Sequence, residues 1–173
     1  MSDWKNRTKY DKITQEVIAH VPDDLLAWAM FDYIRLRIGS DYERTLEVLA
    51  ELPLGFAVIY HLFALDAEIR NGGFNQYFFN GLDRDAAHQF RSLELIGAVK
   101  HRQILQKAFT IHAQEKENEE LQHRYSDQTI ESFLSTYGMT KLDECDDAWY
   151  ALEREFGSAI VEFIRAQPEL FVT

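Results

Sequence analysis

Residues 68–81 read Glu-Ile-Arg-Asn-Gly-Gly-Phe-Asn-Gln-Tyr-Phe-Phe-Asn-Gly, and this stretch decides how the chain folds. The segment before it, residues 56–69, is almost entirely apolar and contains no helix breaker, which predicts a long buried helix. Gly72 and Gly73 are expected to end that helix, because glycine accepts the left-handed backbone that closes one. The aromatic and amide side chains that follow are expected to be buried and hydrogen-bonded.

The polar residues of this stretch allow two interpretations. In the first, Asn71 and Asn80 close helix ends while the aromatic side chains fill the core. In the second, five polar residues converge on a small-molecule pocket, namely Glu68, Asn71, Gln76, Tyr77 and Asn80. The stretch holds no nucleophile beside a base and no set of metal ligands that would favour the pocket.

Apolar residues recur at helical spacing along the rest of the chain, and no run alternates as a half-buried strand does. We therefore expect an all-α protein, a single compact domain over residues 1–173 with no significant sheet. Helices are predicted over residues 8–21, 23–38, 41–52, 53–71, 83–96, 99–111, 130–137, 140–152 and 156–164. The helix over residues 41–52 should be capped by Ser40 and should turn four residues inward: Leu46, Val48, Leu49 and Leu52. The polar run 114–127 is compatible with a solvated helix or a loop.

The charge of the chain is strongly unbalanced. It carries 18 basic and 29 acidic residues, a net charge of −11, and residues 113–173 alone hold 14 acidic and 5 basic ones. Direct binding to nucleic acid is not expected, because phosphate contacts need clustered lysine and arginine. An acidic surface favours a basic partner, although acidity also serves simply to keep proteins soluble.

Several classes of function lack their residues. Residues 1–5 show no apolar run of a signal peptide, no stretch is apolar enough to span a membrane, and one cysteine forms no internal disulfide, so we expect a cytoplasmic protein. Cys145 lies among four acids, which disfavours a reactive thiolate. The chain has no phosphate-binding loop, no zinc motif and a single Glu-x-x-His at Glu120 and His123. We expect no metal, no cofactor, no catalytic residue and no enzymatic activity; His61 is expected in the core, and His88, His101 and His112 at the surface.

Carboxylates three or four residues apart on a helix lie about 5 to 6 Å from each other, a spacing that resembles the phosphates along a DNA strand. The candidate surface is Asp143, Glu144, Asp146 and Asp147, with Glu115, Glu117, Glu119 and Glu120 or the line Glu43, Glu47 and Glu51 as second contributors. The alternative is that the first four stand in the opening turns of a helix, where the helix dipole favours acids. Both interpretations remain open at this point.

The central motif also resembles a known family. Glu68, Asn71-Gly72-Gly73-Phe74, Gln76-Tyr77-Phe78 and Asn80 are similar to the signature of the DNA mimic protein nineteen family. Residues 93–98 (Leu-Glu-Leu-Ile-Gly-Ala) fit the same family, as do Leu142-Asp143, Asp146-Asp147, Trp149-Tyr150, Phe163-Ile164 and residues 168–171. The resemblance spans roughly residues 50–173.

This resemblance implies an all-helical homodimer whose acidic surface imitates the backbone of double-stranded DNA. Such a protein would occupy the DNA-binding face of a bacterial transcription regulator, of the helix-turn-helix kind, and keep it off its operator. Residues 68–80 are nearly neutral, so the motif identifies the fold and the mimicry depends on the acids elsewhere. The alternatives are a helical binding or scaffold module for another partner and a small-molecule-binding enzyme that uses the region from Glu68 to Asn80.

Overall fold

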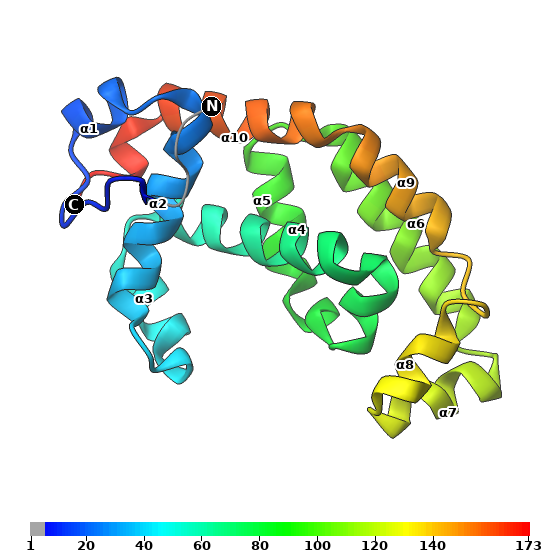
Figure 1. Ribbon diagram of the computed structural model, residues 1–173. Helices are drawn as coiled ribbons and strands as arrows, with labels where there is room; N and C mark the ends of the chain where they lie inside the picture. The colour runs from blue at the N-terminus through cyan, green and yellow to red at the C-terminus, as the bar shows by residue number, and fades with distance from the viewer. Residues whose placement is uncertain (1–5) are drawn as a thin grey trace. The chain divides into compact units, whose positions relative to one another are not determined.

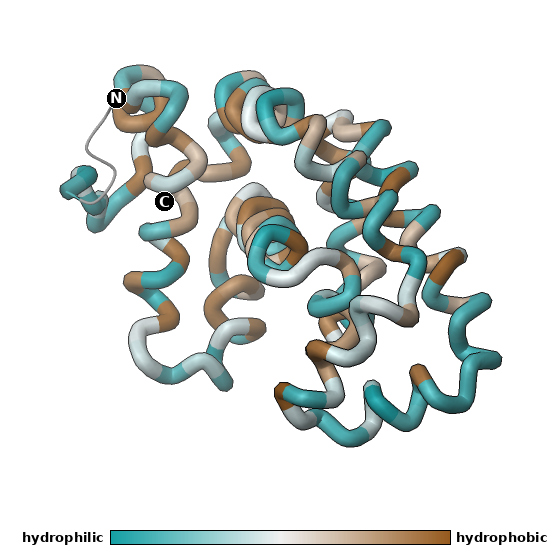
Figure 2. The backbone as a smooth tube through the Cα atoms, turned by 45° about the vertical axis from the view of Figure 1, so that its right-hand side comes forward, coloured by the Kyte–Doolittle hydropathy of each residue, from teal (hydrophilic) through white to brown (hydrophobic). Residues whose placement is uncertain are grey.

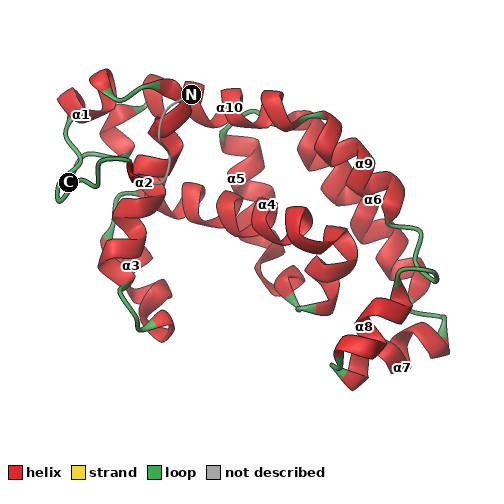
Figure 3. Cartoon of the chain, viewed as in Figure 1, coloured by secondary structure: helices red, strands yellow, loops and turns green. Residues whose placement is uncertain are grey.

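The computed structural model describes residues 6–173, and all regular structure in that range is helical (Figures 1 and 3). The all-α prediction is therefore confirmed. The α-helices are α1 (Gln15–His20), α2 (Asp23–Ile38), α3 (Thr45–Glu51), α4 (Leu54–Phe79), α5 (Ala86–Leu95), α6 (Val99–Glu115), α7 (Glu119–Asp127), α8 (Ile130–Thr136), α9 (Asp143–Ala151) and α10 (Glu153–Ala166). Three 3-10 turns complete the described chain, η2 (Tyr42–Arg44), η3 (Leu82–Asp85) and η4 (Pro168–Leu170).

Contacts group the chain into two compact units. The first consists of residues 1–63 and 157–173, and the second of residues 64–156. Helices α4 and α10 each contribute residues to both units. Whether the two units behave as one domain, as the sequence predicts, stays a prediction.

The first unit is built on α2. Its start after Pro22 and its end at Gly39, which has φ 66°, follow the prediction, because both signals are local in the sequence. Leu26, Met30 and Ile34 of α2 are fully buried. The ring of Phe56 lies against Tyr33 and Phe171, with ring centroids 5.1 and 5.6 Å apart, which joins the start of α4 to α2 and to the end of the chain.

Two predictions in the first unit are wrong. The helix expected over residues 8–21 begins only at Gln15, where the Thr14 side chain accepts from the backbone N–H of Val17. The helix expected over residues 41–52 is divided into η2 and α3, and Asp41, instead of Ser40, caps it. Val48 and Leu49 are buried as expected, but Leu46 in the first turn of α3 is 72% exposed.

The second unit has its own core, in which Leu65, Ile69, Phe74, Leu105 and Trp149 are almost completely buried. Helix α6 packs against α5 and α9, and α7 packs against α8. The polar run that the sequence left open forms α7, whose tube is mostly hydrophilic in Figure 2.

Three further predictions in the second unit are corrected. The helix expected over residues 83–96 begins only at Ala86, because Asp83 lies inside η3. The helix expected from Thr140 begins at Asp143. His101, expected at the surface, is 2% exposed between the rings of Trp149 and Phe156, at centroid distances of 4.8 and 4.7 Å. The ring of His112 is half-buried as well.

Candidate functional site

The double glycine bends α4 instead of ending it. Gly72 has φ −161° and ψ 30°, and Gly73 has φ 69° and ψ −175°, after which the helix resumes and continues to Phe79. The Gly73 conformation lies in a region of backbone space that only glycine readily occupies. The prediction of a helix end is thus corrected to a kink, and the kink leaves backbone groups on both sides that need partners.

Asp146 of α9 supplies the partner on the C-terminal side of the kink. The backbone N–H of Phe74 donates to Asp146 Oδ1 over 2.7 Å. A Cβ atom on Gly73 would collide with the same carboxylate, so the glycine is also needed for this close approach. The pKa of Asp146 is raised to about 6, chiefly by burial and to a smaller extent by the charges of Asp143 and Asp147, against the opposing effect of the hydrogen bond from Phe74.

Two tyrosines supply the partners on the N-terminal side. Tyr137, which follows α8, donates its hydroxyl to the carbonyl of Gly72 over 2.8 Å. Tyr150 of α9 donates to the carbonyl of Ile69 over 2.5 Å. Burial raises the pKa of both hydroxyls, so they stay protonated as donors. The kink is therefore bonded to α9 and to the end of α8, and it sets where these elements lie in the second unit.

Four of the five residues proposed for a pocket do meet. Glu68 Oε2 accepts from Gln76 Nε2 (2.7 Å) and from Asn80 Nδ2 (2.9 Å), and Asn71 Nδ2 donates to Gln76 Oε1 (3.0 Å). These side chains bond to one another across the kink, which differs from the helix-end role considered for Asn71. Asn80 does follow the last residue of α4, and its backbone N–H donates to the Gln76 carbonyl. Tyr77 does not join them, because it is buried and donates to Gln89 Oε1 over 2.6 Å.

Asn75 meets the expectation that the amide side chains after the double glycine are buried and hydrogen-bonded. Its amide is buried, donates to Thr136 Oγ1 (2.7 Å) and accepts from the hydroxyl of Tyr125 (2.8 Å). Asn75 thereby holds α7 and α8 against the segment that follows the kink. Its place within the motif was the only sequence signal for this role.

The acids of α9 divide into two groups. Asp143, Glu144 and Asp147 are exposed, whereas Asp146 is half-buried at the kink. Glu144 accepts from Lys107 of α6 over 2.8 Å. Within residues 6–173, neither Asp143 nor Asp147 has a cation within ion-pair distance. These two residues are four apart on one helix and lie on the same face.

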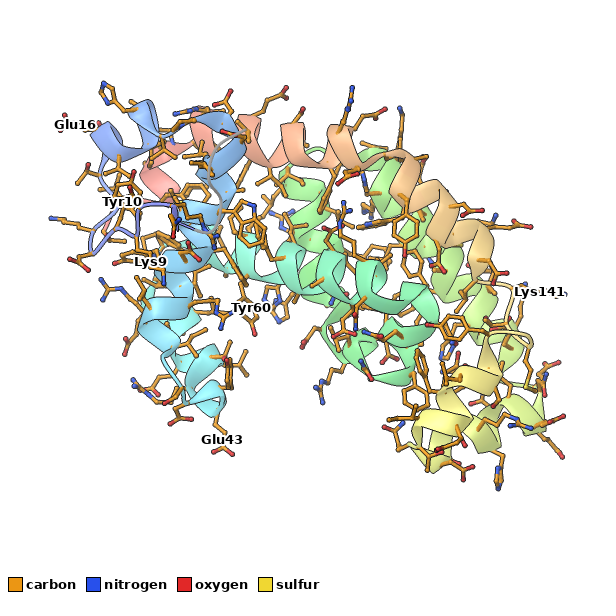
Figure 4. The ribbon with its side chains drawn as sticks, viewed as in Figure 1. Lys9, Tyr10, Glu16, Glu43, Tyr60 and Lys141 are labelled. Carbon is orange, nitrogen blue, oxygen red and sulfur yellow. The ribbon has the colours of Figure 1, made fainter. Side chains whose placement is uncertain are left out.

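The second set of predicted acids lies beside the start of α9. Glu115, the last residue of α6, is half-buried and accepts from the backbone N–H of Lys141 (2.7 Å) and from Thr140 Oγ1 (2.9 Å). These hydrogen bonds join the end of α6 to the loop that precedes α9, in which the Lys141 side chain projects outward (Figure 4). Three acids that follow Glu115 in the sequence are exposed, Glu117, Glu119 and Glu120, and Glu120 pairs with Arg124 at 2.9 Å.

The third set lies in the other unit. Glu43 belongs to η2, whereas Glu47 and Glu51 belong to α3, so the expected single helical line is divided. All three side chains are exposed, and Glu43 projects away from its neighbours in Figure 4. Glu47 pairs with Arg44 at 3.2 Å. Because these three acids belong to the first unit, they are not counted with the acids of the second.

Cys145, the single cysteine of the chain, is buried in α9. Burial raises the pKa of Cys145 to about 11, which keeps this side chain a thiol. Residues 6–173 contain no cluster of three or more histidine, cysteine or acidic side chains with the geometry of a metal site. No helix in the same range combines the length and hydropathy needed to cross a bilayer. The expectation about a signal peptide falls on residues 1–5, outside the described chain.

A family model described as DMP19-like protein matches residues 50–167. The chain belongs to the DMP19-like protein family. The resemblance drawn from the motif is therefore confirmed, and in this DMP19-like protein the matched range includes the kink, Asp146 and the exposed acids of α7 and α9. No curated protein and no solved structure matches the chain.

Proposed function

We propose that this DMP19-like protein is a DNA mimic that binds the DNA-binding face of a bacterial transcription regulator, of the helix-turn-helix kind, and blocks operator binding. The observation that carries the proposal is the pair Asp143 and Asp147, exposed, one helical turn apart and without a cation partner among the described residues. Glu117 and Glu119 add exposed charge from the neighbouring segment. We define the mimic surface as Asp143, Glu144, Asp147, Glu117, Glu119 and Glu120.

The charge around this surface supports the proposal. Residues 113–152 contain 10 acidic and 3 basic residues. Like-charged pairs at helical spacing cost a few tenths of a kcal/mol each, and this cost is relieved when a partner brings its own cations. Arginine side chains that bind phosphate bind carboxylate in the same forked geometry. A protein surface built to hold a DNA backbone can therefore hold these carboxylates.

Two members of the mimic surface have partners of their own. Glu144 pairs with Lys107 and Glu120 with Arg124; Glu144, Lys107 and Glu120 are exposed, whereas the Arg124 side chain is half-buried. Exposed ion pairs of this kind contribute roughly 0 to 1 kcal/mol, so a partner's arginine can displace them. Asp146 is left out of the surface, because its carboxylate faces Phe74; we assign to it the positioning of α9.

We propose no catalytic activity for the chain. The carboxylate of Glu68 is engaged by two amides, and Tyr77 is directed to Gln89, so the motif offers no free acid beside a base. The homodimer, the cytoplasmic location and the lack of direct nucleic-acid binding belong to the same proposal. A homodimer is checked by analytical ultracentrifugation, and nucleic-acid binding by titration with labelled duplex DNA.

The decisive experiment is a gel-shift competition. Helix-turn-helix regulators encoded by the same genome are each bound to their operator duplex, and the protein is added at increasing concentration. We expect one regulator to be released by the wild type and release to weaken as salt rises. Asp143→Lys with Asp147→Lys should abolish release. Glu162→Lys with Glu169→Lys makes the same change in net charge at two other exposed acids and should leave release nearly unchanged.

Failure would take one of two forms. If no regulator is released by the wild type, the proposed function is wrong. If a regulator is released equally well by the wild type and the Asp143→Lys, Asp147→Lys variant, the mimic surface is wrong. Far-ultraviolet circular dichroism of each variant confirms that its helix content is unchanged.

A further inference from the structure

Helix α8 carries apolar side chains on two sides, although only one of them is buried in the second unit. On the inner side, the ring of Phe133 lies 4.9 Å from that of Phe79, and Thr136 is fully buried. On the outer side, Ile130 is 74% exposed, Leu134 62% and Tyr137 38%. The spacing of four and three residues places these side chains on one face. We call Ile130, Leu134 and Tyr137 the outer stripe.

The fold explains Tyr137, whose hydroxyl bonds the Gly72 carbonyl, but it does not explain the exposed Ile130 and Leu134 of the outer stripe. A helix that covers one side of a core normally turns polar residues to the solvent. Single exposed apolar residues are common, but three neighbours in eight residues form a continuous apolar strip in water. Truncating Ile130 or Leu134 would remove little buried area from the second unit. The strip is therefore free to contact another molecule.

The surroundings of the outer stripe are acidic. Residues 115–137 contain six acids and two basic residues. Of the two basic residues, Arg124 is held by Glu120 and by Ser135 Oγ. Glu131 follows Ile130 on α8 and is exposed, and so is Asp127 at the end of α7. A second copy placed symmetrically on this stripe would bring like charges together, whereas a cationic partner would be attracted.

The outer stripe also ends beside α9, the helix that carries Asp143 and Asp147. The Tyr137 hydroxyl bonds the Gly72 carbonyl, and the next residue of the kink, Gly73, lies against Asp146 of α9. Asp146 is close enough to raise the pKa of the Tyr137 hydroxyl, although burial is the larger cause. An elongated partner lying along α8 could therefore reach the exposed acids at the start of α9.

We propose that the outer stripe docks a cationic amphipathic helix, whose apolar residues cover Ile130, Leu134 and Tyr137 while its lysines or arginines meet the surrounding acids. The inference rests on the proposed function for the identity of this helix, which would be the base-reading helix of the regulator. Helices that read DNA use apolar side chains against thymine methyl groups as well as basic ones against phosphates. A mimic that offers both kinds of contact holds such a helix more tightly than charge alone.

The test uses a labelled synthetic peptide of leucine and lysine, about 18 residues long so that it is helical, with the leucines on one face. Fluorescence anisotropy measures its dissociation constant from the full-length protein. We expect Ile130→Ser with Leu134→Ser to weaken binding about tenfold, because two aliphatic contacts are lost. Val99→Ser is the matched control, since Val99 is 62% exposed on α6, and it should leave binding unchanged. A peptide of the same composition in scrambled order should bind more weakly.

Three outcomes would overturn the inference. Equal binding of the peptide to the wild type and the Ile130→Ser, Leu134→Ser variant would show that the outer stripe makes no contact. A wild-type dimer that this variant converts to a monomer in sedimentation would make a second copy the occupant. If the wild type and this variant release a regulator equally well in the gel-shift assay, the inference about the outer stripe is wrong and the proposed function stands. No release by the wild type contradicts the proposed function, while the peptide result still decides the stripe.

Discussion

Replacing Gly73 by alanine tests the kink, because two separate costs meet at this residue. The backbone at φ 69° and ψ −175° costs a non-glycine residue about 1 to 3 kcal/mol. The added Cβ would also displace the Asp146 carboxylate and leave the N–H of Phe74 without its acceptor, for about 1 to 3 kcal/mol more. We expect Gly73→Ala to lower the free energy of unfolding by about 3 kcal/mol or more.

The assay is urea and thermal denaturation followed by far-ultraviolet circular dichroism. For a chain of this size a loss of about 3 kcal/mol lowers Tm by about 6 to 12 °C. Gly138→Ala is the control, since Gly138 has no positive φ and its Cβ position is open; we expect a change within about 0.5 kcal/mol. Asp146→Ala should cost less in the Gly73→Ala background than alone, because the two residues interact. A Tm for Gly73→Ala within about 2 °C of the wild type would refute the reasoning.

Three further substitutions probe the second unit, each followed by urea denaturation. Burial raises the pKa of Asp146 to about 6 from its usual 3.8, so the folded protein binds a proton at this carboxyl more tightly than the unfolded chain does. The contribution of this carboxyl to stability therefore grows as pH falls from about 7 to about 4. Asp146→Asn keeps an acceptor for Phe74 without the charge, so it should match or exceed the wild type at about pH 7.5 and lose that advantage at about pH 5. Burial lowers the pKa of His101, whose Nε2 has no hydrogen-bond partner within residues 6–173. The unfolded chain therefore takes up a proton at this histidine more readily, and stability falls with pH below about 6.5. His101→Leu should lose less stability between about pH 7 and 5 than the wild type does. Asp66 accepts from Trp149 Nε1 (2.9 Å) and Arg70 Nε (2.6 Å), so Asp66→Ala should cost about 2 kcal/mol and red-shift the Trp149 emission; unchanged stability and emission would contradict this.

The sequence predicts best where its signals are local. Helix α2 is bounded by Pro22 and Gly39, which lie next to its ends, and its limits were predicted correctly. The pair Gly72 and Gly73 was interpreted as a helix end for the same reason. What lets the helix continue is Asp146, 72 residues further along the chain than Phe74, and no local pattern points to that contact.

The candidate site was predictable in composition but not in detail. The acids of α9 follow one another in the sequence, so their spacing cannot tell that Asp146 is turned toward the kink while Asp143 and Asp147 face solvent. Glu115 likewise stands among exposed acids but bonds the backbone of Lys141. The burial of His101 depends on the rings of Trp149 and Phe156, which come from later helices.

The arrangement around Gly73 divides the chain into two tiers of mutational tolerance. Substitutions at Gly72, Gly73 or Asn75 should be removed by selection in every lineage, whatever each protein binds, since they disturb the frame that carries the exposed helices. Substitutions of the exposed carboxylates, by contrast, leave the folded structure intact and change only which partner the protein binds. Related proteins can thus share the glycine pair and still bind different partners. Deep mutational scanning that selects for folding alone would separate the two tiers.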